Sequence, residues 1–514
     1  MDSEKAFAQL KGEVDAWVAS IKWDEYPKLP MPKPDETKVI REAVTGYQIL
    51  WPHEYMVLDS PLLQRLRYIH QTALAYLVYP TANHTRFDHS LGCAKTAQQI
   101  GEKVIGSGEK TRIAELRLAA LLHDVGHTFF SHLSETIMQS RFRNLYIAVK
   151  GASQFKGHDM GLAEMSSYLI VKSEQFHAFL DKVVHYYRDF SMVDLDNVAN
   201  LIIRAPVDGL AFMGDIISGP FDADKLDYLV RDCHFCGIRA DVDVERVLVS
   251  AALLDRKRFP SSAPEWSKYY LVMLSAGESI LEQITFNRML LYPAIYHHHK
   301  VRAIECMIRA IFETIWEDPD NIRNEHLKFE NIHDFYRLTD FQFLAAVEAE
   351  PQLRPIIERL MKRDLFKRCL VMSLPYLEKT GKFIDLYKKS SEDYPEKLYR
   401  LRDIIWEELP KDKRGSIHDL WVDIPKPPTS IAKDPDSAWI DIGTRKMLRL
   451  RDFFPYPGWV TSYEINKWKG HVFSISDPST RCAVNEAAKR VFKDKPYYLE
   501  FGERATEECK IPRG

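Results

Sequence analysis

Helical patterning governs most of this chain. From about Lys38 to residue 320, apolar residues recur at three- and four-residue spacing, as in TRIAELRLAALLHDV, LGCAKTAQQIGEKVI and HHHKVRAIECMIRAIFETIW. The segment SPLLQRLRYIHQTALAYLV begins with a Ser-Pro helix start and carries a long amphipathic pattern. Because the alternation typical of strands is rare in this stretch, the sequence predicts an all-α core.

The segment before this core has a different character. Residues 4–20 predict an amphipathic helix, and the proline-rich YPKLPMPKPDETK that follows predicts an extended linker. This N-terminal arm either docks on its own core, which we favour slightly, or swaps onto a neighbouring subunit.

The last third of the chain mixes helices with short strands. FYRLTDFQFLAAVEAE and LRPIIERLMKRDLFKRCL predict helices, whereas DLWVDIPKPP, RKMLRLRDFF and GHVFSISDP are β-branched or aromatic runs that predict strands. VNEAAKRVF predicts a closing helix. We therefore expect a mainly α fold in three parts: the arm and linker (1–36), the all-α core (37–325) and a smaller α+β C-terminal lobe (326–514).

Composition excludes several classes of protein. The net charge of −3 over 514 residues gives no global basic field, so a nucleic-acid or membrane binder is not indicated. Seven scattered cysteines are too few for a disulfide framework, and the lone pair Cys233 and Cys236 makes a zinc knuckle improbable. The N-terminus does not resemble a signal peptide, and no stretch reaches the ~18 apolar residues of a membrane span. We expect a cytoplasmic, intracellular protein.

The stretch LHDVGHTFFSH, from Leu122 to His132, concentrates polar chemistry directly after an apolar run. On a helix, His123 and His127 lie one turn apart, and Asp124 beside His123 offers a carboxylate to the same ion. One such pair is only half a metal site. Taken alone, this stretch is better explained as a helix end whose side chains cap backbone groups.

Three other stretches carry groups of the same kind. NHTRFDHSLG (83–92) contains two histidines and an arginine, FDADKLDYLVRD (221–232) places carboxylates and cations at helical spacing, and KGHDMGLAEM (156–165) contains a His-Asp step. Each has an ordinary alternative: a polar helix start, a solvated helix face with ion pairs, and a loop without function.

The order of these stretches is more specific than any one of them. The succession of His89, His123-Asp124 and Asp224 resembles the HD-domain metal-dependent phosphohydrolases. Four stretches are similar to the deoxynucleoside triphosphate triphosphohydrolase branch of that family, which has vertebrate and microbial members. They are SPLLQRLRYIHQ, NHTRFDHSLG, LLHDVGHTFFSH and DADKLDYLVRDCHFCGI. The resemblance covers about residues 38–310 and implies that the 37–325 core is an HD-domain catalytic core. DLWVDIPKPP and DPSTRCAVNEAAKRVF are similar, less specifically, to the C-terminal lobe of the microbial members.

The resemblance implies a role for each residue of these motifs. The metal ligands would be His89, His123, Asp124 and Asp224. Two nitrogens and two carboxylates suit Fe, Mn, Zn or Ni, and the family often adds Mg on the triphosphate. The acid–base cluster would consist of His127, His132, His158, Asp159 and Glu135, with His132 placed to protonate the leaving 5′ oxygen. The substrate would be held by Arg86, Gln71, Lys225, Tyr228, Arg231, Asp232 and Tyr296.

The sequence departs from the family pattern at two positions. Thr72 stands where nucleotide-selective members carry a leucine against the sugar C2′, and its hydroxyl can tolerate or bind a 2′-OH. Discrimination against ribonucleotides is therefore in doubt. The family's Tyr-x-His-Lys appears as Tyr296-His297-His298-His299, with Lys300 one place late, so the lysine contact is lost or shifted.

The resemblance also implies partners. An activator nucleotide would bind between subunits at Lys38, Asp59, Gln64 and Arg67. The alternative, which is as good, is that these residues only brace the start of a helix. The family assembles as dimers or tetramers, so a homo-oligomer is expected.

Three functions compete. The leading one is hydrolysis of a (deoxy)nucleoside triphosphate to nucleoside and tripolyphosphate. The second is an HD-type phosphodiesterase or nuclease acting on cyclic nucleotides or single strands. The third is a non-catalytic nucleotide sensor, for example in antiviral defence, and it ranks last because none of the four ligands is missing.

Overall fold

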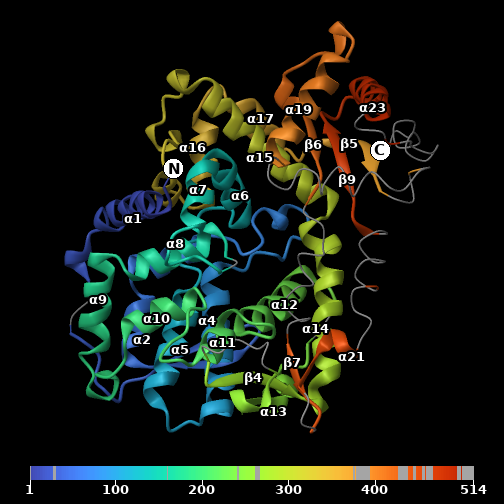
Figure 1. Cartoon of the computed structure of the whole chain (residues 1–514). Coiled ribbons are helices and arrows are strands. Elements are labelled where there is room, and N and C mark those ends of the chain that lie inside the picture. The colour runs from blue at the N-terminus through green and yellow to red at the C-terminus, as the bar shows by residue number, and fades with distance from the viewer. Residues whose placement is uncertain are drawn as a thin grey trace. The chain divides into compact units, whose positions relative to one another are not determined.

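The chain folds into two compact units, each built mainly of helices (Figure 1). The computed structural model describes residues 2–26, 30–158, 160–239, 242–260, 267–373, 377, 394–425, 438–443, 447–453, 458, 467–494 and 499. The first unit combines Met1–Arg288, Phe329–Phe343 and Lys433–Tyr456, and the second takes Met289–Lys328, Leu344–Ala432 and Pro457–Gly514. The mainly α class is confirmed, but the units do not follow a single division of the chain near residue 325.

The first unit contains the predicted motifs. Its helices are α1 Ser3–Ala19, α2 Pro52–Leu58, α3 Pro61–Arg65, α4 Arg86–Ile105, α5 Lys110–Leu122, α6 His132–Arg141, α7 Arg143–Lys150, α8 Leu162–Val171, α9 Glu174–Val184, α10 Leu195–Ile202, α11 Ala211–Ser218, α12 Ala223–Cys236 and α13 Val244–Ser250. Helix α14, Glu278–Leu291, runs from this unit into the second. No helix in the described ranges is long and apolar enough to cross a membrane.

Helix α4 is the centre of the first unit and packs against both α5 and α12. It starts at Thr85, whose hydroxyl and the Asp88 carboxylate form a reciprocal capping box. Gly92 lets α12 approach closely, because a Cβ at that position would stand inside contact distance of the Asp227 carboxylate and 2.5 Å from the Arg231 guanidinium. The contact of α4 with α12 therefore brings His89 beside the DADKLDYLVRD helix.

Helix α1 packs on its own chain, as we had slightly favoured. Ala6, Leu10 and Val14 are fully buried, and the Trp17 ring stacks on Tyr336 at 4.6 Å between centroids. Asp2 caps the helix by accepting from the Lys5 backbone N–H.

The prediction of an all-α core is wrong in one respect, because two small sheets belong to the first unit. Strands β1 (Lys38–Glu42) and β2 (Gly46–Leu50) form an antiparallel hairpin. Strands β3 (Ala251–Asp255) and β4 (Tyr269–Leu274) pair with β7 (Trp439–Asp441) and β8 (Met447–Arg449) in the order β3-β4-β7-β8. In this hairpin polar side chains such as Glu42 and Gln48 are buried, whereas the apolar Val39 and Ile49 are exposed. This reverses the usual burial of apolar residues, so the sequence pattern did not indicate a strand.

The long helix predicted over SPLLQRLRYIHQTALAYLV is also wrong. Helix α3 ends at Arg65, and two 3-10 turns, Leu66–Tyr68 and Ala75–Leu77, follow it. Ala73 between them has a φ of 52°, which interrupts any helix. This irregular segment carries Gln71 and Thr72.

The second unit is a three-stranded sheet with helices. Its sheet has the order β5-β9-β6, with β5 Lys367–Met372, β9 Gly470–Ser474 and β6 Leu420–Asp423. Its helices are α15 His299–Glu317, α17 Arg354–Met361, α19 Tyr394–Glu407 and α23 Pro478–Lys493, while α16, Asp340–Ala349, begins in the first unit. Buried residues of α19, α23 and the strands form one core, including Leu401, Val472 and Phe492.

The C-terminal predictions are mostly confirmed. Strands lie within DLWVDIPKPP and GHVFSISDP, and VNEAAKRVF lies on α23. RKMLRLRDFF forms a strand only over β8, because Leu450–Phe453 is the helix α21. The helix predicted over LRPIIERLMKRDLFKRCL is wrong beyond Met361, since KRCLVM forms β5 and pairs with β9.

The close contact at Gly92 gives a stability prediction. Gly92→Ala should destabilise the protein by about 1–3 kcal/mol, because the new methyl group must displace the buried Asp227–Arg231 pair. Gly12→Ala is the matched control: Gly12 lies on α1 with open space around its Cβ direction, so alanine there should stabilise by about 0.5–1 kcal/mol. Urea unfolding measures both, and equal effects would contradict this account of Gly92.

Candidate functional site

His89 is held at the centre of the site by a chain of buried charges. Its Nδ1 lies 2.7 Å from Asp227 Oδ2, and Asp227 in turn accepts from Arg231 Nε at 2.7 Å. Arg231 also donates to Glu42 of the β1–β2 hairpin. All four side chains are at least nine-tenths buried. Because a carboxylate accepts at Nδ1, the proton of neutral His89 sits there and the Nε2 lone pair remains available for a ligand.

The Nε2 side of His89 meets the other predicted ligands. Asp224 Oδ1, on the first turn of α12, lies 3.1 Å away, and Asp124 Oδ2 lies 3.7 Å away. His123, which directly follows α5, donates from Nδ1 to the Ala120 carbonyl at 2.7 Å, so its Nε2 is also left unprotonated. That atom is buried without a hydrogen-bond partner and lies 3.5 Å from Asp124 Oδ1. The structure therefore brings the four predicted ligands together.

The charge of this cluster suits a cation. Burial alone would raise the pKa of Asp124, but the charges of Arg86, His123 and His127 hold it well below its usual range. Ionised carboxylates and unprotonated imidazole nitrogens at these separations fit a divalent transition ion. The orphaned Nε2 of His123 is the observation that favours a metal over a purely structural network.

Cys93 is a further donor that the sequence did not single out. One turn after His89 on α4, its sulfur lies 3.5 Å from both ring nitrogens of His89. The atoms of His89, Cys93, His123 and Asp224 all lie within 4.8 Å of one another. Burial raises the pKa of the Cys93 thiol well above its usual value, whereas neighbouring charges keep the Asp124 carboxyl ionised with its oxygens facing both His89 and His123. Asp124 is therefore the better candidate for the fourth ligand.

A second cluster adjoins the first across Asp124. His127 Nε2 lies 3.3 Å from Asp124 Oδ1, and its ring meets that of His132 edge-on at 5.0 Å. His132 Nδ1 lies 3.0 Å from Glu135 Oε2. The side chain of His132 is 72% exposed, whereas His127 and Glu135 are buried. Burial and the charge of Arg86 lower the pKa of His127 to about 4.

The structure adds a residue to this cluster that sequence reasoning missed. Glu164 Oε2, on α8, is buried without a hydrogen-bond partner. It lies beside Glu135: a Cβ built on Gly161 would stand within 3 Å of an oxygen of each carboxylate. Burial, with the charge of Glu135 added, raises the pKa of Glu164 to about 7. The only signal in the sequence was an acidic residue within the otherwise apolar run LAEMSSYLIV.

Of the two remaining members of the predicted acid–base cluster, the structure describes only His158. His158 is half-buried, and its pKa is lowered by burial and by the charge of Arg204 rather than by any member of the cluster. Asp159 lies outside the described residues.

Arg86 connects the clusters to a strained turn. Its Nη1 donates to Asp124 at 2.7 Å and its Nε to Ser131 Oγ at 3.0 Å, while Nη2 is buried without a hydrogen-bond partner. Ser131 and Phe130 both have a left-handed φ, 51° and 55°, which is costly for residues other than glycine. A rigid support is needed to hold such a turn.

Asp340 is that support, and no sequence motif indicates it. The side chain is fully buried at the start of α16, in the part of the chain that belongs to the first unit. Its Oδ1 accepts from the Phe130 backbone N–H at 2.8 Å, and its Oδ2 accepts from the His70 backbone at 2.9 Å and lies 2.7 Å from His70 Nδ1. Asp340 therefore fixes both the Phe130–Ser131 turn and the segment that leads to Gln71.

The predicted sugar-contacting residues lie along one edge of this region. The backbone N–H of Gln71 donates to the His84 carbonyl at 3.1 Å, and His84 Nε2 lies 2.8 Å from Asp232 Oδ1. Buried oxygens of Gln71 and Thr72 lack hydrogen-bond partners. Polar atoms left in this state are available to hydroxyl groups of a ligand.

The predicted phosphate contacts of α12 divide into two groups. Arg231 does not face a ligand, because its guanidinium is fully buried between Asp227 and Glu42. Its role in the structure is to hold Asp227, which in turn orients His89. Lys225 is buried and donates to Asp222 Oδ2 at 2.5 Å and to the Gly219 carbonyl at 2.9 Å. Tyr228 is partly exposed on the same helix.

Tyr296 belongs to the second unit. It ends a π-helical turn, Tyr292–Tyr296, directly after α14. His298 then caps α15 by accepting from the Lys300 backbone N–H, so Lys300 lies in the first turn of that helix.

The predicted activator residues partly meet. Arg67 Nε donates to Gln64 Oε1 at 2.9 Å and its guanidinium lies 3.6 Å from the centre of the Phe87 ring, while Gln64 donates to the Leu58 carbonyl. Lys38 lies over the Tyr55 ring at 5.6 Å, and Asp59 caps the end of α2. These contacts are those of the bracing alternative.

Comparison with protein families matches two models to this chain. The HD domain matches residues 86–191 and the HD associated region matches residues 242–492. The first covers α4, the LHDVGH stretch and Glu164, and the second begins after α12.

Curated relatives agree with these matches. An uncharacterized protein of Methanocaldococcus jannaschii is 30% identical over 68% of this chain and 62% of its own length. Proteins named deoxynucleoside triphosphate triphosphohydrolase SAMHD1 are 24% identical in Gallus gallus and 27% in Homo sapiens, each over 65% of this chain and over 56% and 55% of their own lengths. The chain thus spans little more than half the length of the named enzymes.

A solved structure shows the same fold. The crystal structure of a hypothetical protein from Aquifex aeolicus aligns with a TM-score of 0.59 and 21% identity over 88% of this chain and all of that one. Together with the paired His and Asp residues of the site, the two family models and the relatives show that the chain belongs to the HD-domain family.

Proposed function

We propose that this protein hydrolyses (deoxy)nucleoside triphosphates at the α-phosphate, releasing nucleoside and tripolyphosphate. The observation that carries the proposal is Arg86, whose guanidinium bonds to Asp124 and keeps a buried Nη2 group without a partner. A guanidinium beside a cation site is a pre-formed receptor for a phosphate oxygen. The names of the SAMHD1 relatives support the same substrate class.

The predicted ligands His89, His123, Asp124 and Asp224 would hold the metal. A divalent ion there supplies Lewis-acid polarisation of the α-phosphate and of an attacking water. The residues of the chain do the rest: Asp227 keeps the Nδ1 proton on His89, and Arg86 orients the phosphate through Nη2.

Proton transfer is assigned to the second cluster. His132 is the exposed member, and Glu135 at its Nδ1 fixes the ring so that Nε2 faces outward for a leaving 5′ oxygen. Glu164 beside Glu135 supplies a carboxyl group that keeps its proton near neutral pH, so that the pair of acids does not carry two charges.

The remaining contacts follow the same proposal. Gln71 and Asp232 would bind the 3′-hydroxyl, and Lys225 with Tyr228 the triphosphate tail, for which Lys225 must exchange its bond to Asp222 for one to phosphate. Thr72 offers a free hydroxyl toward the sugar, so we expect ribonucleotides to be accepted beside deoxyribonucleotides. Activation by a nucleotide at Arg67 and Gln64, and assembly into a dimer or tetramer, belong to the proposal as well.

The ligand assignment predicts metal content. His123→Ala and Asp124→Ala should each lose the stoichiometric transition metal of the purified protein, because each removes a donor of the cluster. Cys93→Ala is the matched control and should keep the metal, since Asp124 rather than this thiol is assigned as the fourth ligand. Elemental mass spectrometry measures all three; metal retained in both ligand variants, or lost from the cysteine variant, would overturn the assignment.

The reaction predicts its products. The metal-loaded protein, incubated with each NTP and dNTP, should yield tripolyphosphate and nucleoside by anion-exchange analysis. His132→Ala should keep its metal and fold but lower kcat by about 10²–10⁴, the usual contribution of a general acid. Diphosphate, monophosphate or cut oligonucleotides would identify a phosphodiesterase or nuclease instead. No turnover with any metal would identify a sensor.

Glu164 predicts a pH dependence of stability. Its pKa is higher in the folded protein, about 7, than the ordinary 4.5, so its contribution to stability is complete below pH 4.5 and is lost as the pH rises through 7. Glu164→Gln cannot ionise. Its free energy of unfolding should therefore rise relative to that of the wild type by on the order of 2 kcal/mol as the pH increases from 5 to 8. Exposed Glu348→Gln should show no such change. Parallel pH curves for wild type and Glu164→Gln in urea unfolding would refute this role.

A further inference from the structure

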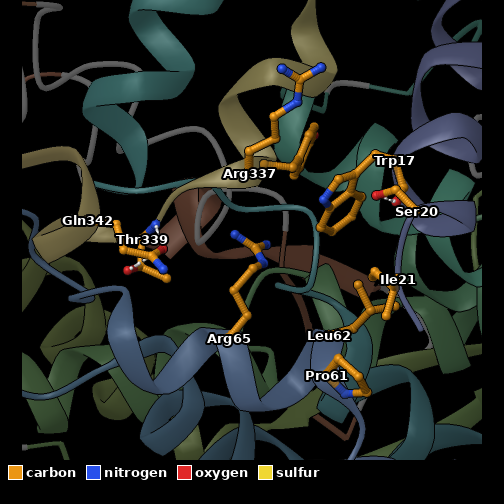
Figure 2. Close-up of a pocket in the computed structure, with 10 residues that line it drawn as sticks. Trp17, Ser20, Ile21, Pro61, Leu62, Arg65, Arg337, Thr339 and Gln342 are labelled. Carbon is orange, nitrogen blue, oxygen red and sulfur yellow. Dashed lines mark hydrogen bonds between the residues drawn. The ribbon is translucent and has the colours of Figure 1, made fainter. Parts of the chain in front are cut away.

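A cavity of about 400 Å³ is lined by Arg65, whose guanidinium also contacts the loop that carries the HD motif. It is lined by the end of α1 and the residues after it, by α3, and by the segment from Tyr336 to Gln342, all of which belong to the first unit. Figure 2 shows Arg65 extending into the middle of this group, toward the space between Trp17, Thr339 and Arg337. None of the catalytic or ligand residues lines it.

Arg65 forms no ion pair among the described residues, although the charge of the more distant Asp340 partly compensates its own. Its Nη2 donates to the backbone carbonyls of Val125 at 3.0 Å and His127 at 2.6 Å, but Nε and Nη1 are buried without hydrogen-bond partners. Among the described residues, no carboxylate lies within ion-pair distance of its guanidinium. Burial lowers the pKa of Arg65 to about 10, still far above neutrality, so the side chain remains charged. An unpaired buried charge is costly, and the cost falls when an anion enters.

The walls of the cavity define the kind of anion. The stacked rings of Trp17 and Tyr336 lie beside the guanidinium, 5.3 and 5.8 Å from it, and Leu62 adds apolar surface. Arg337 is a second cation at the rim, already paired with Asp334 at 2.7 Å. The volume is larger than a phosphate ion needs and falls within the usual range of small-molecule sites.

We propose that this cavity binds a small organic anion, whose carboxylate or phosphate pairs with Arg65 and whose apolar body lies against Trp17 and Leu62, and that the anion regulates the adjoining site. The route is short. The same guanidinium holds the carbonyls on either side of Gly126, between the predicted ligand Asp124 and His127. A ligand that draws Arg65 toward the cavity changes how firmly this loop is held. Regulation rests on the proposed function; binding does not.

Binding of phenyl phosphate and benzoate to the metal-loaded protein, measured by isothermal titration, tests the site. Both should bind, inorganic phosphate should bind more weakly, and neutral benzyl alcohol should not bind. Arg65→Met should weaken binding at least tenfold. Since that variant also loses the loop contacts, Ile21→Glu is the decisive one: it places a carboxylate at the cavity wall opposite Arg65 and should abolish binding while the protein stays folded. Exposed Lys156→Met should bind as the wild type does.

Binding that survives in Ile21→Glu, or is absent up to tens of millimolar probe, would overturn the proposal. Tighter binding of phenyl phosphate than of benzoate would identify the ligand as a phosphate. Tighter binding of benzoate would identify it as a carboxylate. Because titration needs no turnover, the site can be established even if triphosphates are not hydrolysed. Where they are, saturating benzoate should change kcat of the wild type at least twofold and leave Ile21→Glu unchanged.

Discussion

The buried pair of Arg231 and Asp227 is the interaction on which the rest of the site depends. Arg231 lies between two carboxylates, Asp227 and Glu42, and Asp227 passes the hydrogen bond on to His89. Removing one member of such a network leaves an unpaired charge in the interior, which costs far more than the bond itself contributes. The network therefore fixes the tautomer and orientation of His89 with little freedom, and the positions of Asp124 and Asp224 have meaning only because His89 is fixed.

Two sets of chemistry meet at Asp124. One of its oxygens faces His89 and accepts from Arg86, and the other faces His123 and His127. The metal-ligand cluster and the acid–base cluster thus share one carboxylate and cannot be moved independently. Supports from distant parts of the chain hold this arrangement from behind: Asp340 at the Phe130–Ser131 turn and Arg65 at the loop carbonyls.

The four residues predicted as metal ligands do lie close together, and the sequence could indicate this because all four belong to short motifs that resemble the family's. The sequence did not reveal the residues that hold this site in place from elsewhere in the chain. Arg231 looks like a phosphate contact when only its own helix is considered; its true partner, Glu42, is 189 residues away on a hairpin whose apolar residues face outward. Asp340 had no local pattern and Glu164 only its place in an apolar run, because the roles of both come from tertiary contacts. Helix periodicity likewise could not reveal the positive φ of Ala73, which breaks the segment after α3.

The position of Glu42 determines where the smallest fragment that preserves this site can begin. The β1–β2 hairpin precedes every predicted metal ligand in the chain and contains none of them, so the motifs alone would leave it out. Yet it supplies one of the two carboxylates that neutralise Arg231, and through Asp227 it reaches His89. A fragment that begins after Glu42 would keep every predicted metal ligand. In that fragment the buried Arg231 would retain only one of its two carboxylate partners, Asp227. Charge balance therefore requires that a fragment retaining this site begin before Glu42, upstream of every motif.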